Sequence, residues 1–259
     1  METTDCIMCV QPALTSRERV RYFPRQLLTA DDMRAEQEYF REKQRRHNRF
    51  LHGWGVVCGL EVKQPADKDL KWQVTVCPGY ALTPQGDEIL VTDTMQFDLQ
   101  TKLQCPEPCA VGWSCPPEET PPDDPTKKPM YLAIRYVECQ SRPIRVHPAG
   151  CGCDEAACEY SRVRDSFELK ALWNLPKSHE LAAKADEEWR KIWNNPGSKG
   201  KLVSSPMPCQ VCSEDPWIVL ASIILPTEEE TRIVQGIIKY TDRRVLYSTT
   251  ALQGLLMSK

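Results

Sequence analysis

The sequence lacks a long apolar run, a basic leader and a large excess of either charge. Its 259 residues include 33 basic and 36 acidic side chains, so the net charge is -3 at pH 7. That balance does not favour nucleic acid or an anionic membrane as a partner. No apolar run approaches the roughly 20 residues that span a bilayer, and the first residues do not form a signal peptide. We therefore expect no transmembrane segment, no nucleic-acid partner, and synthesis and assembly in the cytoplasm.

Catalytic motifs are also missing. There are only four histidines, and His47 and His52 are five residues apart, so they do not share a helical face as paired metal ligands would. No serine elbow, zinc-protease motif or calcium loop is present. Gly53, Gly55 and Gly59 follow a helix-like run, whereas a dinucleotide fingerprint follows a strand. The glycines therefore indicate a corner between a helix and a sheet, and we predict that the protein is not an enzyme.

Helix and strand patterns are clear in several places. Thr29 is a favourable N-cap with Asp32 three residues later, which predicts a long helix over residues 29–51. The alternating segments GVVCGLEV, LKWQVTV, YALT and DEILVTD then predict strands, as do MYLAIRYVEC, VRDSFELKALW and PWIVLASIIL further along. Ser178 is the expected cap of a second helix within an inserted region, residues 176–208.

These elements predict a mainly β protein with α additions, in the α+β class. We expect an antiparallel meander or barrel-like sheet with one long N-terminal helix and one inserted helix. The predicted organisation is an extended arm (1–25), a β-rich domain (26–242) and a C-terminal tail (243–259). Within the domain, we expect residues 105–129 and 139–163 to be two loops rich in cysteine or proline.

The 13 cysteines are the most informative chemistry. Thiolates clustered in short loops suit tetrahedral zinc. In an up-and-down sheet alternate loops share one end, which would bring the Cys105 loop to the segment with Cys209 and Cys212. We predict a zinc site from Cys105, Cys109, Cys209 and Cys212, and a possible second site from Cys139, Cys151, Cys153 and Cys158. Disulfides in a particle that leaves the cell, or free thiols, remain the alternatives.

The long helix has too thin an apolar stripe to be stable alone. Met33 and Phe40 are seven residues apart, and few other apolar side chains share their face. Such a helix must pack on its own sheet or on another copy of itself. We therefore predict that this helix and the N-terminal arm are assembly surfaces, with Met33, Phe40, Phe50, Arg45 and Arg46 as the contact residues.

Several segments carry a resemblance that extends over most of the chain. They are RYFPRQLLTADDMRAEQEYFREKQRRHNRFLHGWGVVCGLEV, VTVCPGYALTPQGDEILV, YLAIRYVEC, YSRVRDSFEL, WIVLASIIL and RRVLYSTTAL. In them the chain resembles a family of small proteins encoded with contractile phage-tail-like injection systems. Members of that family carry Gly where this chain has Arg25.

The resemblance implies a structural subunit near one end of the tube, at the baseplate, the fibre attachment or the cap. Its partners would be other subunits of the particle, and parts at the ends of such tubes are commonly three- or six-fold, so a trimer or hexamer is expected. The released particle would carry the protein outside the cell. Two other readings stay open: a cytosolic zinc-binding adaptor unrelated to injection systems, and a tail-associated hydrolase that cleaves glycans with scattered acids.

Overall fold

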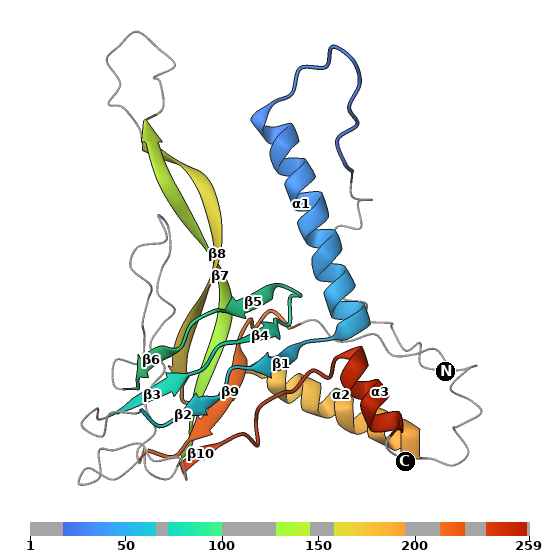
Figure 1. The fold of residues 1–259 in the computed structure, drawn as a ribbon. Helices are drawn as coiled ribbons and strands as arrows, with labels where there is room; N and C mark the ends of the chain where they lie inside the picture. The colour runs from blue at the N-terminus through green and yellow to red at the C-terminus, as the bar shows by residue number, and fades with distance from the viewer. Residues whose placement is uncertain are drawn as a thin grey trace.

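The computed structural model describes residues 18–65, 72–99, 128–145, 158–194, 213–225 and 237–257. Within these ranges the chain is a mixed α+β protein with mostly antiparallel sheets and three α-helices, as the sequence predicts. Figure 1 shows a β body from which helix α1 and a long hairpin both project. None of the described helices is long and apolar enough to cross a membrane.

Helix α1 (Ala30–His47) continues into a π-helical turn, η1 (Asn48–His52). The predicted capping box is confirmed: Thr29 Oγ1 accepts from the Asp32 backbone N–H at 3.2 Å, and Asp32 Oδ2 accepts from the Thr29 N–H at 2.9 Å. Gly53 follows η1 with a φ of 83°, a backbone conformation that favours glycine.

Two small antiparallel sheets follow the helix. One has the strand order β1-β4-β5, and the other has the order β2-β3-β6. Their strands are β1 (Gly55–Gly59), β2 (Val62–Lys63), β3 (Gln73–Val76), β4 (Gly79–Leu82), β5 (Glu88–Val91) and β6 (Met95–Asp98).

The segment GVVCGLEV is therefore two strands and not one. Gly59 and Leu60 both have positive φ, 61° and 50°, and this bend moves the chain from one sheet to the next. A side chain at Gly59 would come within 2.1 Å of the Pro78 carbonyl oxygen, so the close approach of the end of β1 to the start of its partner β4 requires glycine there.

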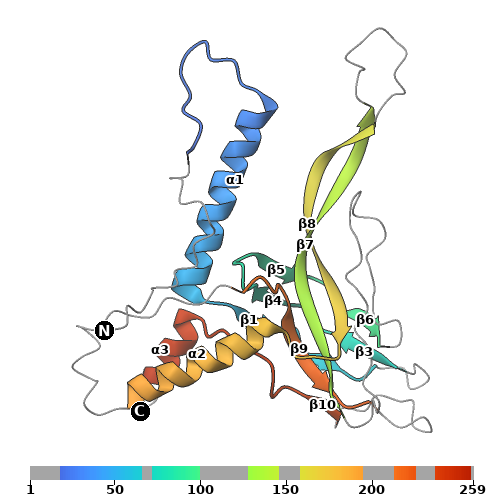
Figure 2. The ribbon, with the colours of Figure 1, turned by 180° about the vertical axis from the view of Figure 1, so that it is seen from behind.

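The third sheet has the order β10-β9-β7-β8. Its strands are β7 (Met130–Arg145), β8 (Cys158–Leu172), β9 (Ile218–Ile223) and β10 (Ile238–Lys239). Strand β9 is buried along its whole length and is one of the two inner strands, which confirms the central position that its apolar sequence predicts. Only Met130–Ile134 of β7 pair with β9. Beyond them β7 and β8 continue as a two-stranded arm, seen from both sides in Figures 1 and 2.

Helices α2 (Lys177–Asn194) and α3 (Thr249–Met257) lie below α1 in Figure 1. Ser178 does not cap α2 as expected. It lies inside the first turn, where its hydroxyl donates to the Trp217 carbonyl oxygen at 3.2 Å. The Lys177 N–H is instead bound by Asp215 at 2.9 Å. This capping group comes from a segment 38 residues away, so local sequence could not reveal it.

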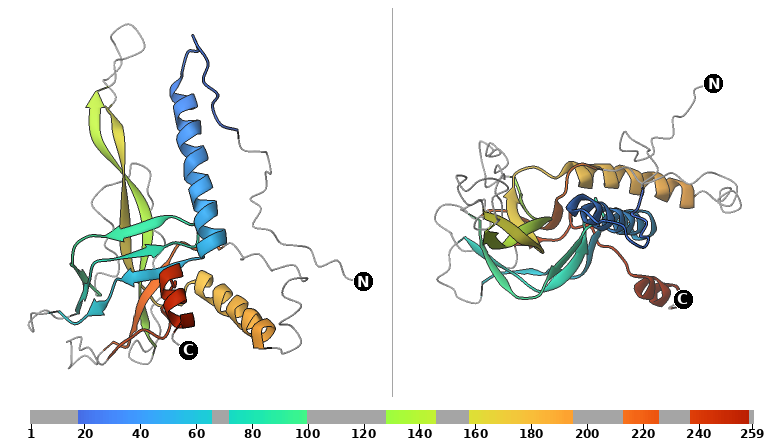
Figure 3. Two further views of the ribbon diagram at one scale, coloured as in Figure 1. Left: turned by 45° about the vertical axis from the view of Figure 1, so that its right-hand side comes forward. Right: turned by 90° about the horizontal axis from the view of Figure 1, so that it is seen from above.

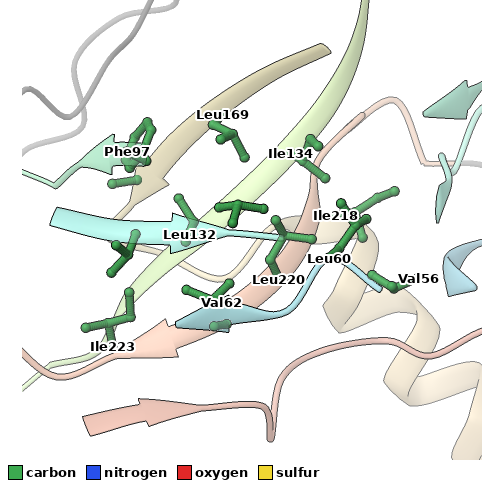
Figure 4. Close-up of a cluster of buried hydrophobic side chains, with 14 of the residues drawn as sticks. Val56, Leu60, Val62, Phe97, Leu132, Ile134, Leu169, Ile218, Leu220 and Ile223 are labelled. Carbon is green, nitrogen blue, oxygen red and sulfur yellow. The ribbon is translucent and has the colours of Figure 1, made fainter. Parts of the chain in front are cut away.

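The apolar core lies where the three sheets meet (Figure 4). Leu132 of β7 and Leu220 of β9 are fully buried, as is Phe97 of β6, and burial of each such side chain contributes about 2 kcal/mol. Among the described residues the strands form three sheets that do not close into a barrel, so the sheets are antiparallel as expected but the barrel-like form is not confirmed. The bend at Gly59 explains this, because it directs β2 away from β1 and ends the first sheet.

Candidate assembly surface

Helix α1 is held to the body at its C-terminal end. Asn48 is 4% exposed and its side-chain amide donates to the Gly86 carbonyl oxygen at 2.9 Å. Arg45 donates through Nε to Asp87 at 2.6 Å. Gly86 has a φ of 94°, and a Cβ there would lie 2.3 Å from the Arg45 carbonyl oxygen. The turn between β4 and β5 therefore fits closely against the last turn of α1.

Ion pairs reinforce this attachment. Burial alone would lower the pKa of Arg45, but hydrogen bonds to Asp87 and Glu42 raise it overall. Burial raises the pKa of Asp87, and the adjacent Arg45 opposes that shift. Further along the helix, Arg41 contacts Glu138 of β7 at 2.5 Å. The described contacts between α1 and the body are thus polar rather than apolar.

The remaining surface of α1 is accessible, since the helix has no buried residue. Some of its exposed side chains are apolar. Met33 is 45% exposed, and Phe40 is 53% exposed. Phe50 and Arg46 are also exposed. Four of the five predicted contact residues are therefore accessible, whereas Arg45 is occupied by its bonds to Asp87 and Glu42.

The segment before α1 adds apolar area that the sequence reasoning did not single out. In Figure 3 the segment that precedes α1 runs back alongside the helix. It carries four exposed large side chains, Tyr22, Phe23, Leu27 and Leu28. Two aromatic and two leucine side chains within seven residues were a visible signal of this surface.

A tight turn shapes this segment. The Gln26 N–H donates to the Phe23 carbonyl oxygen at 3.2 Å, with Pro24 and Arg25 between them. Arg25 has a φ of 70°, which is the third position of a type II turn and favours glycine. The turn therefore forms with Arg25 at a position that favours glycine.

The β7–β8 arm is a second projecting surface. Its outer half carries three exposed apolar side chains: Ile144, Tyr160 and Val163. Tyr136 and Asp165 form a cross-strand hydrogen bond of 2.6 Å nearer the body. Burial, the Asp165 hydrogen bond and nearby acids raise the pKa of Tyr136 strongly, so its phenol stays protonated as a donor. The arm and α1 project from the same side of the body in Figures 1 and 2.

Most of the predicted zinc ligands fall outside the described residues. They are Cys105, Cys109, Cys151, Cys153, Cys209 and Cys212. Cys158 begins β8. Cys139 is buried in β7 and is disulfide-bonded, while Cys58 and Cys77 are free, so neither of these two is its partner. A sulfur in a disulfide cannot act as a thiolate ligand. Among the described residues no group of three or more metal-ligating side chains occurs.

The directions of β7 and β9 bear on the first predicted zinc site. Because β7 and β9 are antiparallel, Met130 pairs with Ile223 and Ile134 pairs with Ile218. The chain therefore enters β7 and β9 at opposite ends of the shared sheet. The expectation that both cysteine segments share one end does not follow from this topology. The four-cysteine site itself stays a prediction.

A buried polar cluster ties α2 to the corner after α1 and to the C-terminal segment. His179 is 7% exposed, and its Nε2 accepts from the Val219 N–H at 3.0 Å. Its ring packs edge-on against Trp54 at 4.9 Å between centroids. The guanidinium of Arg244 lies 5.1 Å from the centre of the Trp54 ring. Burial is the main reason that the pKa of His179 falls to about 4, and the positive charge of Arg244 adds to it.

The C-terminal segment is bonded to β1. The Val56 N–H donates to the Arg244 carbonyl oxygen at 2.9 Å, and the Leu246 N–H donates to the Val56 carbonyl oxygen at 2.8 Å. A Cβ at Gly55 would lie 2.8 Å from that same Arg244 oxygen. Residues 243–246 thus contact the body directly, and the predicted boundary at residue 243 falls within this contact.

Comparison with known proteins does not assign this chain to a family. No family model matches this chain, and no curated protein matches its sequence. The fold and its surfaces therefore define an α+β protein with two projecting elements, a helix and a hairpin, that carry exposed apolar side chains.

Proposed function

We propose that this chain is a structural subunit of a contractile phage-tail-like injection particle. It would act at the baseplate, the fibre attachment or the cap end, by protein–protein assembly and without catalysis. The observation that carries the proposal is the exposed apolar surface of α1 and its preceding segment, on a helix whose base is fixed to the body. The resemblance described above supplies the kind of particle.

The energetics of α1 support an assembly role. Most of the stability of helices in proteins comes from tertiary packing of one face, and α1 buries none of its own residues. Exposed side chains such as Phe40 and Met33 would each gain from burial against a partner, by roughly 1 kcal/mol or more. A neighbouring subunit would therefore stabilise the helix, and the fixed base would set its direction before assembly.

The experiment is deletion of the gene in the organism that encodes it, with electron microscopy of the purified particles. We expect particles that are incomplete at one end, together with the presence of this protein in wild-type particles by mass spectrometry. Re-expression of the wild-type chain should restore them, and re-expression of Phe40→Lys should restore them poorly. Particles that are complete without the protein would refute the proposal.

Zinc belongs to the same proposal as a stiffening element. Cys105, Cys109, Cys209 and Cys212 would hold it between two segments far apart in sequence. Elemental analysis of protein purified under reducing conditions should find about one zinc ion per chain for a single four-cysteine site. Protein without zinc would remove this part of the proposal and would leave the assembly role standing.

A further inference from the structure

Residues 244–247 lie beside β1 as a short extended segment. The Val56 N–H donates to the Arg244 carbonyl oxygen at 2.9 Å, and Val56 and Val245 form a parallel bridge. Val245 is 48% exposed and Tyr247 is 56% exposed. A segment that is bonded on one side and open to solvent on the other can separate locally, at a cost well below that of unfolding the core.

The imidazole of His179 lies buried between the C-terminal segment and β9. Its Nε2 accepts from the Val219 N–H at 3.0 Å, and the ring also forms a hydrogen bond with the Asp242 backbone. A second proton on Nε2 would therefore point at another donor. His179 is also the third residue of α2, where the partial positive charge of the helix N-terminus disfavours a cation.

The charged groups around His179 act mainly against its protonation. The guanidinium of Arg244 lies 5.1 Å from the centre of the Trp54 ring, and His179 packs edge-on against the same ring. Asp186 of α2 binds Arg244 at 2.5 Å. Burial and then the positive charge of Arg244 lower the pKa of His179, and Asp242 opposes them. Strand β9 and the corner after α1 face the ring with uncharged groups, an N–H and the indole of Trp54.

We propose that His179 is an acid-operated latch: protonation of its ring releases residues 244–247 from the side of β1. A charged ring would lie beside Arg244 and would lose its hydrogen bond with Val219. Both costs fall when residues 244–247 move away, because the guanidinium leaves and water reaches the ring.

Other contacts limit the release to this short segment. The Tyr240 hydroxyl donates to the Val62 carbonyl oxygen at 2.7 Å, and Arg243 donates to the Leu60 carbonyl oxygen at 2.9 Å. Both bonds join groups that do not titrate between pH 4 and pH 7. The chain therefore stays attached as far as Arg243, and helix α3, which follows the segment, would move with it. The latch is independent of the proposed assembly role.

Proton linkage gives the size of the effect. The pKa of His179 is about 4 while the segment is closed, and it returns towards 6.5 when the ring is exposed. The open form binds the proton more tightly, so its population rises as the pH falls. The open form should be favoured about twentyfold more at pH 5 than at pH 7.

The test is hydrogen exchange of the full-length protein at pH 7 and pH 5, with each rate expressed relative to that of an unstructured chain at the same pH. The amides of Val56 and Leu246, which are bonded across the contact, should lose about twentyfold in protection at pH 5. In His179→Gln the two pH values should give nearly equal protection, since glutamine does not titrate. His52→Gln, at an exposed histidine, is the matched control and should behave as wild type.

A second measurement, on the wild type, keeps the test decisive if His179→Gln folds poorly. Exchange through a local release hardly depends on urea, whereas exchange through global unfolding accelerates with it. At pH 5 in low urea, the rates of Val56 and Leu246 should therefore stay constant while those of the β3 amides rise. Equal protection at both pH values in the wild type, or an equal loss in His179→Gln, would overturn the latch. So would rates that rise with urea as steeply as those of β3. The assembly role is tested separately by the particles of the deletion strain.

Discussion

Stability should fall between pH 6.5 and pH 4 because of one side chain, His179. The neutral ring accepts a hydrogen bond from the Val219 N–H through Nε2. A hydrogen bond with the backbone of Asp242 partly offsets the shift of its pKa. Protonation at Nε2 would remove the acceptor and place N–H against N–H in a buried site. The folded state therefore disfavours the charged ring, and the pKa of His179 falls to about 4 from 6.5.

The sign and size follow from proton linkage. Between pH 6.5 and pH 4 the unfolded chain binds a proton that the folded chain does not, so the free energy of unfolding decreases as the pH falls. The contribution of His179 is nearly complete at pH 7. At pH 5 about 2 kcal/mol of it is lost, because each pKa unit corresponds to about 1.4 kcal/mol. Below pH 4 the loss levels off at about 3 kcal/mol.

The assay is urea unfolding at pH 7 and pH 5, at one fixed protein concentration, for wild type and His179→Gln. Glutamine keeps hydrogen-bonding groups and does not titrate. The loss of stability from pH 7 to pH 5 should therefore be smaller in the variant by about 2 kcal/mol. His52→Gln, at an exposed histidine, should behave as wild type. Equal losses in wild type and His179→Gln would refute the reasoning.

Three further predictions concern other parts of the chain. Gly86→Ala should lower the free energy of unfolding by about 2 kcal/mol or loosen the base of α1, because residue 86 has a positive φ and lies against the Arg45 carbonyl oxygen. Urea unfolding measures the first effect and hydrogen exchange of α1 measures the second. A variant with the same stability and the same exchange as wild type would contradict the prediction. Arg25→Gly should relieve about 1 kcal/mol of local backbone strain, seen as slower proteolysis at the turn that contains this residue. Cys209→Ser should lower the zinc content of purified protein, whereas Cys58→Ser should not; equal zinc in both variants would exclude Cys209 as a ligand.

The sequence predicted the elements better than their arrangement. The capping box at Thr29 and the apolar β9 follow from interactions within a few residues, so they could be predicted. The cap of α2 could not, because Asp215 comes from a distant segment. The division of the strands into separate sheets could not be predicted either, because it depends on the close approach of Gly59 to Pro78. Periodicity within one strand does not report such a contact.

In the candidate surface too, features set by nearby residues could be predicted, and features set by distant residues could not. Met33 and Phe40 were predicted from their spacing on one helix face, and the structure leaves both exposed. Arg45 was also predicted on that surface, yet its side chain binds Asp87, which lies 42 residues away in sequence. The exposed side chains of the β7–β8 arm were missed because they are ordinary strand residues. Within the described part of the chain, β9 pairs only with Met130–Ile134 of β7, and this pairing could not be predicted from the sequence of the arm.

The way in which α1 is attached argues for its use in assembly. A helix that served only its own fold would gain most by burying Met33 and Phe40 against the sheet. Here the contacts with the body are instead hydrogen bonds and ion pairs at one end, centred on Asn48 and Arg45. Such directional bonds fix the orientation of a helix without using its apolar side chains. The apolar side therefore remains accessible to a partner that approaches a helix already held in place.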